Sequence, residues 1–270
     1  MYCHRHLLAE ELRKSYLGLA ALPPRDSSPA ADASFDIEAG AAPGGSSRIA
    51  FGKAIDIRPS VAMRKVSARK RGSKIVRLVD PFRKREIQAE SGLEEAVALI
   101  LIARSDLREI REQQRPDVAA SSKARRYFVD FLTVDRDGRK VAYEVKYAQD
   151  VEAATKERLE ILARDAGDSF AAEFRLVTEK DLSAVAIENA RLIVDCGSDA
   201  DLDAQDVVRD SVVGQGGHTT ARRIGVETGL GARGVRAAFA LIQSGLFKPA
   251  RGAPLDQDTV LAIGRDPRAS

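Results

Sequence analysis

The chain has 270 residues, of which 44% are hydrophobic and 31% charged, a composition that predicts a globular protein of one or two domains. The longest apolar block, residues 97–103, is far too short to cross a bilayer, so no membrane association is expected. The first residues, "MYCHRHLLAEELRK", lack the apolar stretch of a secretory signal, and we expect a cytoplasmic protein. Cys3 and Cys196 are too few for a disulfide framework.

The first part of the chain is predicted to be a flexible segment, residues 1–48, followed by a basic arm, residues 49–85. The segment "LPPRDSSPAADASFDIEAGAAPGGSS" is rich in Pro, Ala, Gly and Ser and has no apolar periodicity. Between residues 64 and 85 a series of Lys and Arg is opposed by one acid, Asp80. Such clustering suits a polyphosphate partner, although a solvated arm without a ligand is the alternative. The candidate DNA contacts of this arm are Arg69, Lys70, Arg71, Lys74, Arg83, Lys84 and Arg85.

Residues 86–195 alternate between helical and strand patterns. Ser91 and Glu94 have the spacing of a helix start, and the helix is predicted to run to about Ala103. Two strands follow in "RRYFVDFLTVDRDGRKVAYEVK", joined at "DRDG". Next come a helix in "VEAATKERLEILARDAG", a strand in "FRLVTE", and in "DLSAVAIENARLIV" either a helix or a helix passing into a strand. This order predicts an α/β or α+β domain.

Residues 206–265 have a different pattern, with two short helices separated by "TGLG". The second helix is predicted from Arg233 to Ser244, where Gly245 stops it. This is typical of a helix-turn-helix or winged-helix-like domain, in which Arg233 and Arg236 are candidate DNA contacts. A helical module that does not bind DNA is the alternative.

The two strands of the hairpin carry charged residues on one face. If the turn centres on Asp137, Asp130 lies opposite Glu144, and Lys146 follows on the same face. The other face is apolar. Two opposed carboxylates repel each other by up to about 1 kcal/mol, unless a divalent cation such as Mg²⁺ lies between them. A lysine beside such a site can hold the attacking water in phosphodiester hydrolysis. The alternative is a solvent-facing cluster of weak ion pairs.

These elements resemble the PD-(D/E)xK nuclease superfamily and, within it, the TnsA endonucleases of transposons. The resemblance is carried by "SGLEEAVALILIARSDLREIREQ", by "VDFLTVDRDGRKVAYEVK" and by "EFRLVTEKDL", and it covers about residues 75–182. It implies an α/β, restriction-endonuclease-like core, with a mixed central sheet flanked by helices. A small helical, winged-helix-like C-terminal domain is expected to follow.

The resemblance also implies the roles of individual residues. Asp130 and Glu144 look like metal ligands assisted by the backbone carbonyl of Val145, and Lys146 looks like the catalytic lysine. The family spacing selects Glu94 as the helix carboxylate that completes the site. The residues alone do not choose between Glu94 and Glu95, which is kept as the fallback. Val129 replaces the proline of the superfamily name, and Gln113 matches a family position for which a structural role is expected.

The activity implied is a Mg²⁺-dependent DNA endonuclease, with Mn²⁺ as a substitute, that nicks the 5′ ends of a transposon. The partners implied are double-stranded DNA at the transposon ends, a DDE-type transposase that acts on the 3′ ends, and an AAA+ ATPase regulator. The protein would then be nucleoid-associated when it is on DNA. Two alternatives are a restriction or repair nuclease with the same metal site, and a DNA-binding adaptor whose nuclease-like domain is silent.

Overall fold

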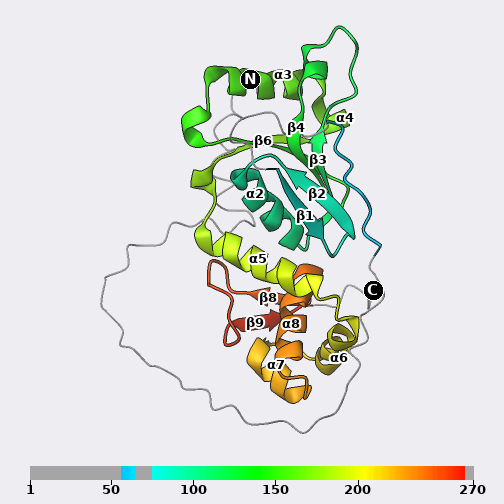
Figure 1. Ribbon diagram of the computed structural model, residues 1–270, viewed down its shortest axis with the longest axis vertical. Helices are drawn as coiled ribbons and strands as arrows, with labels where there is room; N and C mark the ends of the chain where they lie inside the picture. Colours follow the sequence, from blue (N-terminus) through cyan, green and yellow to red (C-terminus); the bar gives the residue numbers. More distant parts are fainter. Residues whose placement is uncertain (1–55, 65–74, 265–270) are drawn as a thin grey trace, which may run out of the picture.

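The computed structural model describes residues 56–64 and 75–264 (Figure 1). The predicted flexible segment, residues 1–48, lies outside the described residues, as does much of the predicted basic arm. Four of the candidate DNA contacts are therefore not placed: Arg69, Lys70, Arg71 and Lys74.

A four-stranded mixed sheet forms the centre of the first part of the chain. Its order is β3 (Leu107–Gln114), β4 (Val129–Asp135), β5 (Lys140–Val145) and β6 (Glu173–Val177). The first three strands are antiparallel to their neighbours, and β6 runs parallel to β5. The parallel pair requires a crossover, which is made by α3 (Ala153–Asp165) and the short α4 (Gly167–Phe170).

Helices cover both faces of this sheet. Apolar residues of α2 (Gly92–Ala103) and α5 (Ala184–Ser198) pack with Phe131, Tyr143 and Val145 in one core. On the other face, Leu132 and Ala142 pack against α3 and the 3-10 helix η1 (Lys123–Arg126). The apolar face predicted for the hairpin is therefore a core face. The charged face is solvent-facing only in part, because α3 covers its central residues.

One strand pair and one further strand in the first part of the chain were not predicted from the sequence. Strands β1 (Val76–Asp80) and β2 (Arg85–Ala89) form an antiparallel hairpin that precedes α2, and contacts link β2 to β3. The predicted boundary between arm and nuclease domain, at residue 86, thus falls inside β2. Strand β3 was also missed, because its sequence, "LREIREQQ", is mostly polar although five of its residues are buried. Short 3-10 helices lie at Ala148–Asp150 (η2) and Glu179–Asp181 (η3).

The C-terminal part consists of three helices and a three-stranded antiparallel sheet in the described residues. The helices are α6 (Leu202–Val212), α7 (Ala221–Glu227) and α8 (Ala232–Ser244). The strands are β7 (His218–Thr220), β8 (Phe247–Pro249) and β9 (Val260–Ile263), in the order β7-β9-β8. Helices α7 and α8 confirm the two predicted helices, and Gly245 ends α8 with φ 86°.

Helix α5 joins the two parts. Within and beyond "DLSAVAIENARLIV", Ala184 to Ser198 form one continuous helix, so the alternative of a helix passing into a strand is wrong. Ala190 and Val194 of α5 lie in the core of the central sheet, whereas Ile193 and Cys196 lie in the core of the C-terminal part. Figure 1 shows α5 between the two parts, in contact with α8. The predicted boundaries at residues 195 and 206 fall within α5 and α6.

None of the helices in residues 56–64 and 75–264 has the length and the apolar composition needed to span a membrane.

Candidate active site

The register of the β4–β5 hairpin is the one predicted from its turn. Phe131 pairs with Tyr143, and Leu132 pairs with Ala142. The turn is closed by Gly138, whose φ of 86° is in the region that favours glycine. Continuing this register to the open end of the hairpin places Asp130 beside the end of β5, where Glu144 and Lys146 lie.

At the open end of the hairpin, the side chain of Asp130, rather than a backbone carbonyl of β4, accepts a hydrogen bond from β5. Its Oδ2 atom accepts a hydrogen bond of 2.7 Å from the backbone N–H of Val145, and its Oδ1 atom accepts one of 3.2 Å from Nε2 of Gln113. Desolvation raises the pKa of Asp130 to about 6, although the hydrogen bond from Val145 and the charge of Arg158 oppose the rise. The carboxylate is thus held in a fixed orientation at a site that disfavours its charge.

Glu94 lies at the start of α2, on the side of the sheet opposite to α3. The Ser91 side chain caps the helix by accepting the N–H of Glu94, and its hydroxyl donates to Oε1 of Glu94 over 3.1 Å. The other oxygen, Oε2, accepts the backbone N–H of Glu90 over 2.8 Å. Burial and the negative charge of Asp130 raise the pKa of Glu94 to about 7. Glu94 is therefore the buried glutamate whose pKa the charge of Asp130 raises. Its neighbour Glu95 is only partly buried.

Glu144 is buried and paired with an arginine that the sequence analysis did not single out. Arg158, on α3, contacts Oε1 of Glu144 in an ion pair. The second oxygen, Oε2, is buried and has no hydrogen-bond partner, and the same is true of Nε of Arg158. Buried polar atoms are satisfied in most native structures, so Oε2 of Glu144 is a candidate oxygen for a further ligand.

Lys146 also points to α3. Its Nζ atom donates a hydrogen bond of 3.1 Å to Oγ1 of Thr155, a buried residue of the first turn of α3. Thr155 and Arg158 are three residues apart and lie on one face of the helix. Helix α3 therefore supplies partners to both charged residues at the end of β5.

The structure thus brings the predicted residues together at one end of the sheet, but not as a finished metal site. In the part of the chain that is described, no three or more His, Cys, Asp or Glu side chains are gathered as a metal-binding group. The ion pair of Glu144 with Arg158 occupies one of the two oxygens that Glu144 could offer to a cation. The backbone N–H of Val145 donates a hydrogen bond to Asp130, as described above.

Three further residues near the site were missed by the sequence analysis as functional residues: Arg158, Gln113 and Arg64. The spacing of Thr155, Arg158 and Leu162 along α3 was the available signal for Arg158, since it places all three on the face that covers the sheet. No local signal indicated the contact between Arg64 and Gln113, because it joins residues 49 apart in the chain, and the resemblance had assigned Gln113 only a structural role. Aromatic rings lie beside these arginines. Arg158 lies over Tyr127, and Arg64 and Arg115 lie over Phe128.

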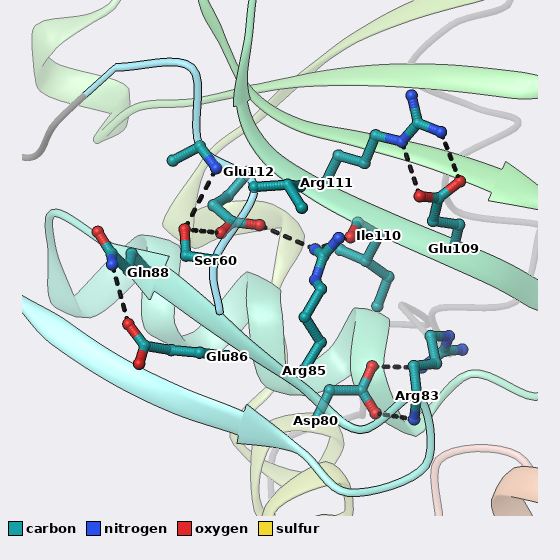
Figure 2. Close-up of polar contacts among 12 residues, drawn as sticks. Ser60, Asp80, Arg83, Arg85, Glu86, Gln88, Glu109, Ile110, Arg111 and Glu112 are labelled. Carbon is teal, nitrogen blue, oxygen red and sulfur yellow. Dashed lines mark hydrogen bonds and ion pairs between the residues drawn. The ribbon is translucent and has the colours of Figure 1, made fainter. Parts of the chain in front are cut away.

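Two of the candidate DNA contacts, Arg83 and Arg85, have structural partners (Figure 2). Arg83 is ion-paired with Asp80 over 2.8 Å and donates to the backbone carbonyls of residues 102, 104 and 107. Arg85 is buried and ion-paired with Glu112 over 2.9 Å. Because these guanidinium groups are committed to the fold, neither is kept as a DNA contact. Lys84, in the turn between them, is exposed.

Arg233 and Arg236, at the start of α8, are exposed but paired. Arg233 forms two hydrogen bonds of 2.8 and 2.9 Å with Asp201, and Arg236 pairs with Asp199. Much of the rest of α8 is buried, from Ala237 through Ile242. This helix therefore presents little free surface for insertion into a DNA groove, which the helix-turn-helix pattern alone did not reveal.

One comparison with known proteins bears on this site. The model of the family described as TnsA-like endonuclease N terminal matches residues 104–179, which include β3 to β6 and α3. A search of curated proteins found no significant match. The match contains Asp130, Glu144, Lys146 and Arg158, and Glu94 precedes it. The resemblance stated from the sequence is confirmed over this stretch, which is similar to the N-terminal domain of TnsA-like endonucleases.

Proposed function

We propose that this protein, which carries a TnsA-like endonuclease domain, is the metal-dependent endonuclease subunit of a heteromeric transposase. In this role it nicks the 5′ ends of a transposon during cut-and-paste transposition, while a DDE-type transposase acts on the 3′ ends. The observation that carries the proposal is the convergence of Asp130, Glu144 and Lys146 at the open end of the β4–β5 hairpin. The charge of Asp130 also raises the pKa of Glu94.

The donor set supports a hard divalent cation. Carboxylate oxygens are the ligands that Mg²⁺ prefers, and it keeps the rest of its coordination shell for water and substrate phosphate. The raised pKa values of Glu94 and Asp130 indicate carboxylates that lack a sufficient positive partner. The unpartnered Oε2 of Glu144 is a further oxygen available to a cation. We assign Asp130, Glu144 and Glu94, with the Val145 carbonyl, to Mg²⁺, for which Mn²⁺ substitutes.

The bound cation would supply charge neutralisation at the scissile phosphate. The residues of the chain do the rest. Gln113 and the N–H of Val145 orient Asp130. Lys146, supported by Thr155, holds the attacking water and stabilises the charge that develops on the phosphate. Arg158, which packs on Tyr127, is proposed to exchange its contact with Glu144 for the negatively charged substrate.

The C-terminal part is proposed to be a winged-helix-like module. Its order of helices and strands, with a three-stranded antiparallel sheet beside α8, supports this assignment. Because α8 is largely buried, we assign the module mainly to contacts with the protein partners, a DDE-type transposase and an AAA+ ATPase. DNA backbone contacts are assigned to Lys84 and to the basic arm, which includes Arg69, Lys70, Arg71 and Lys74.

The proposal is tested by excision of a transposon in the presence of the partner proteins. Asp130→Asn and Lys146→Ala are expected to abolish 5′ nicking while the 3′ ends are still cut. The matched controls are Asp137→Asn and Lys156→Ala, two exposed residues of the same hairpin and of α3, which are expected to leave nicking unchanged. Double-strand breaks that persist in Asp130→Asn and Lys146→Ala would refute the assignment of the site.

A catalytically silent adaptor is the second candidate, and the Arg158–Glu144 ion pair favours it, because such a pair would suit a site that never binds metal. Titration with Mn²⁺ separates the two. An adaptor binds DNA and no metal, whereas the nuclease binds Mn²⁺ with Asp130 intact and loses it in Asp130→Asn. Metal-dependent nicking without any transposase partner would instead favour a restriction or repair nuclease.

A further inference from the structure

Residues 56–64, here called the strap, run along β2 and reach β3. Arg58 exchanges backbone hydrogen bonds with the β2 region: its N–H donates to Lys84 over 3.0 Å, and its carbonyl accepts from Glu86 over 2.9 Å. Farther along, the carbonyl of Val61 accepts from Nε2 of Gln114 over 3.0 Å, and the N–H of Met63 donates to the carbonyl of Gln113 over 3.2 Å. The strap is therefore bound at both ends to the two strands.

A buried polar cluster fixes the middle of the strap (Figure 2). The Ser60 hydroxyl donates to Oε1 of Glu112, whose other oxygen, Oε2, is 2.9 Å from Nη2 of Arg85. The same guanidinium nitrogen donates to the carbonyl of Ile110. Glu112 is fully buried and Arg85 nearly so, so this cluster determines where the strap can lie.

The strap ends at Arg64, which reaches the candidate active site. Its Nη2 atom is 2.8 Å from Oε1 of Glu90 and 2.9 Å from Oε1 of Gln113. Glu90 in turn donates its backbone N–H to Oε2 of Glu94, and Gln113 donates its side-chain amide to Asp130. One arginine thus contacts the residues that orient both carboxylates whose pKa values are raised.

The orientation of the Gln113 amide is determined by its two partners. A guanidinium group only donates and a carboxylate only accepts, so the amide oxygen must face Arg64 and the amide nitrogen must face Asp130. Gln113 is buried, and its φ of 49° is in the left-handed region, which a residue with a side chain seldom adopts. Such a conformation persists only where the surroundings impose it, and the strap supplies them through Met63 and Arg64.

We propose that Arg64 is a positioning residue of the metal site, acting on Asp130 through Gln113, and that the strap is part of the catalytic centre. The inference rests on the proposed function, because it takes Asp130 to be a metal ligand. Arg64 and the strap lie outside the matched residues 104–179, so the family comparison does not assign them. Partners that orient a ligating carboxylate typically contribute 10- to 100-fold to metal affinity, or about that much to activity.

The test is a Mn²⁺ titration of the full-length protein, at a temperature well below its unfolding transition. Arg64→Met and Gln113→Met keep the bulk of each side chain and remove its hydrogen bonds. Each is expected to weaken Mn²⁺ binding by roughly 10-fold or more, and the double variant is expected to lose little beyond the single ones, because the two residues act in series. Arg64→Lys, which keeps the charge and a donor, is expected to restore part of the affinity.

The control is Arg111→Met, which removes an arginine of β3 whose guanidinium group is ion-paired with Glu109. It is expected to leave Mn²⁺ affinity unchanged. If the wild type binds Mn²⁺ and the Arg64 and Gln113 variants bind it equally well, the inference is wrong and the proposed metal site stands, even where the variants melt earlier. If the wild type and all variants fail to bind Mn²⁺, the proposed metal site itself is wrong, and the inference falls with it.

Discussion

The guanidinium group of Arg158 lies against the carboxylate of Glu144, and each side chain keeps one buried polar atom without a hydrogen bond. Removing one partner of a buried ion pair leaves an uncompensated charge, which typically costs about 3–5 kcal/mol. A cation at Glu144 would change this balance, because it would compensate the carboxylate in place of the arginine. If the proposed cation binds at Glu144, the ion pair links the stability of the metal-free protein to the affinity for that cation.

Because Arg158 is partly exposed, we expect Arg158→Ala to lower the free energy of unfolding of the metal-free protein by at most about 3–5 kcal/mol. Saturating Mn²⁺ is expected to recover much of this loss, so that the metal stabilises the variant more than it stabilises the wild type. Chemical denaturation with and without Mn²⁺ measures both effects. Arg164→Ala, at an exposed arginine of the same helix, is the control, and an equal metal effect in wild type and Arg158→Ala would contradict the prediction.

The stability of the metal-free protein should depend on pH through Glu94. Its pKa of about 7 exceeds the ordinary value of 4.5. At pH values between these two, the carboxyl group therefore keeps its proton in the folded state and has released it in the unfolded state. Stability is therefore lost as the pH rises through this window, and the full cost is present above about pH 7. Glu94→Gln is expected to raise the melting temperature, relative to wild type, more at pH 8 than at pH 4. A pH-independent difference in melting temperature would show that Glu94 titrates normally.

The close packing of α7 on α8 depends on glycine. A Cβ atom at Gly225 would lie 2.5 Å from the carbonyl oxygen of Gly231, which belongs to the backbone and cannot turn away. We expect Gly225→Ala to destabilise the protein by about 1–3 kcal/mol, because overpacking outweighs the better helix propensity of alanine. Gly216→Ala, where a Cβ would meet nothing within 4 Å, is the matched control for thermal unfolding. Equal melting temperatures of the two variants would argue against this packing.

The thiol of Cys196 should be inert in the folded protein. The side chain is buried in the C-terminal core, and desolvation raises the pKa of the thiol to about 11, which leaves little reactive thiolate at neutral pH. In a Cys3→Ser background, a thiol reagent is expected to modify Cys196 only when the protein unfolds. The rate of modification in increasing denaturant tests this, and rapid modification in native buffer would mean that α5 is locally open.

Local patterns predicted the elements that have a regular apolar face. Helices α2, α3, α7 and α8 and the β4–β5 register were predicted because capping residues, periodicity and a glycine turn act within a few residues of one another. Strand β3 was missed because it buries Glu112, Gln113 and Gln114, whose cost is offset by partners in distant segments. A sequence pattern cannot show that a polar residue has found such a partner.

The residues of the candidate site likewise differ in whether local sequence patterns could predict them. Asp130, Glu144 and Lys146 lie on one hairpin, so counting along the strands was enough to bring them together. Glu94 required the resemblance to a family, because nothing local selects it over Glu95. Arg158 and Arg64 could be identified only from the structure, because they reach the site from a crossover helix and from a segment that precedes the sheet.

Helix α5 belongs to two cores at once, with Ala190 and Val194 in one and Ile193 and Cys196 in the other. Gly197 is also close to the turn of the β1–β2 hairpin, where a Cβ atom would lie 2.5 Å from the ring of Phe82. The two parts of the chain are therefore expected to melt in a single cooperative transition. A fragment that ends at residue 179, where the family match ends, would lose α5 and expose the apolar residues of α2 that α5 covers, and it is expected to aggregate.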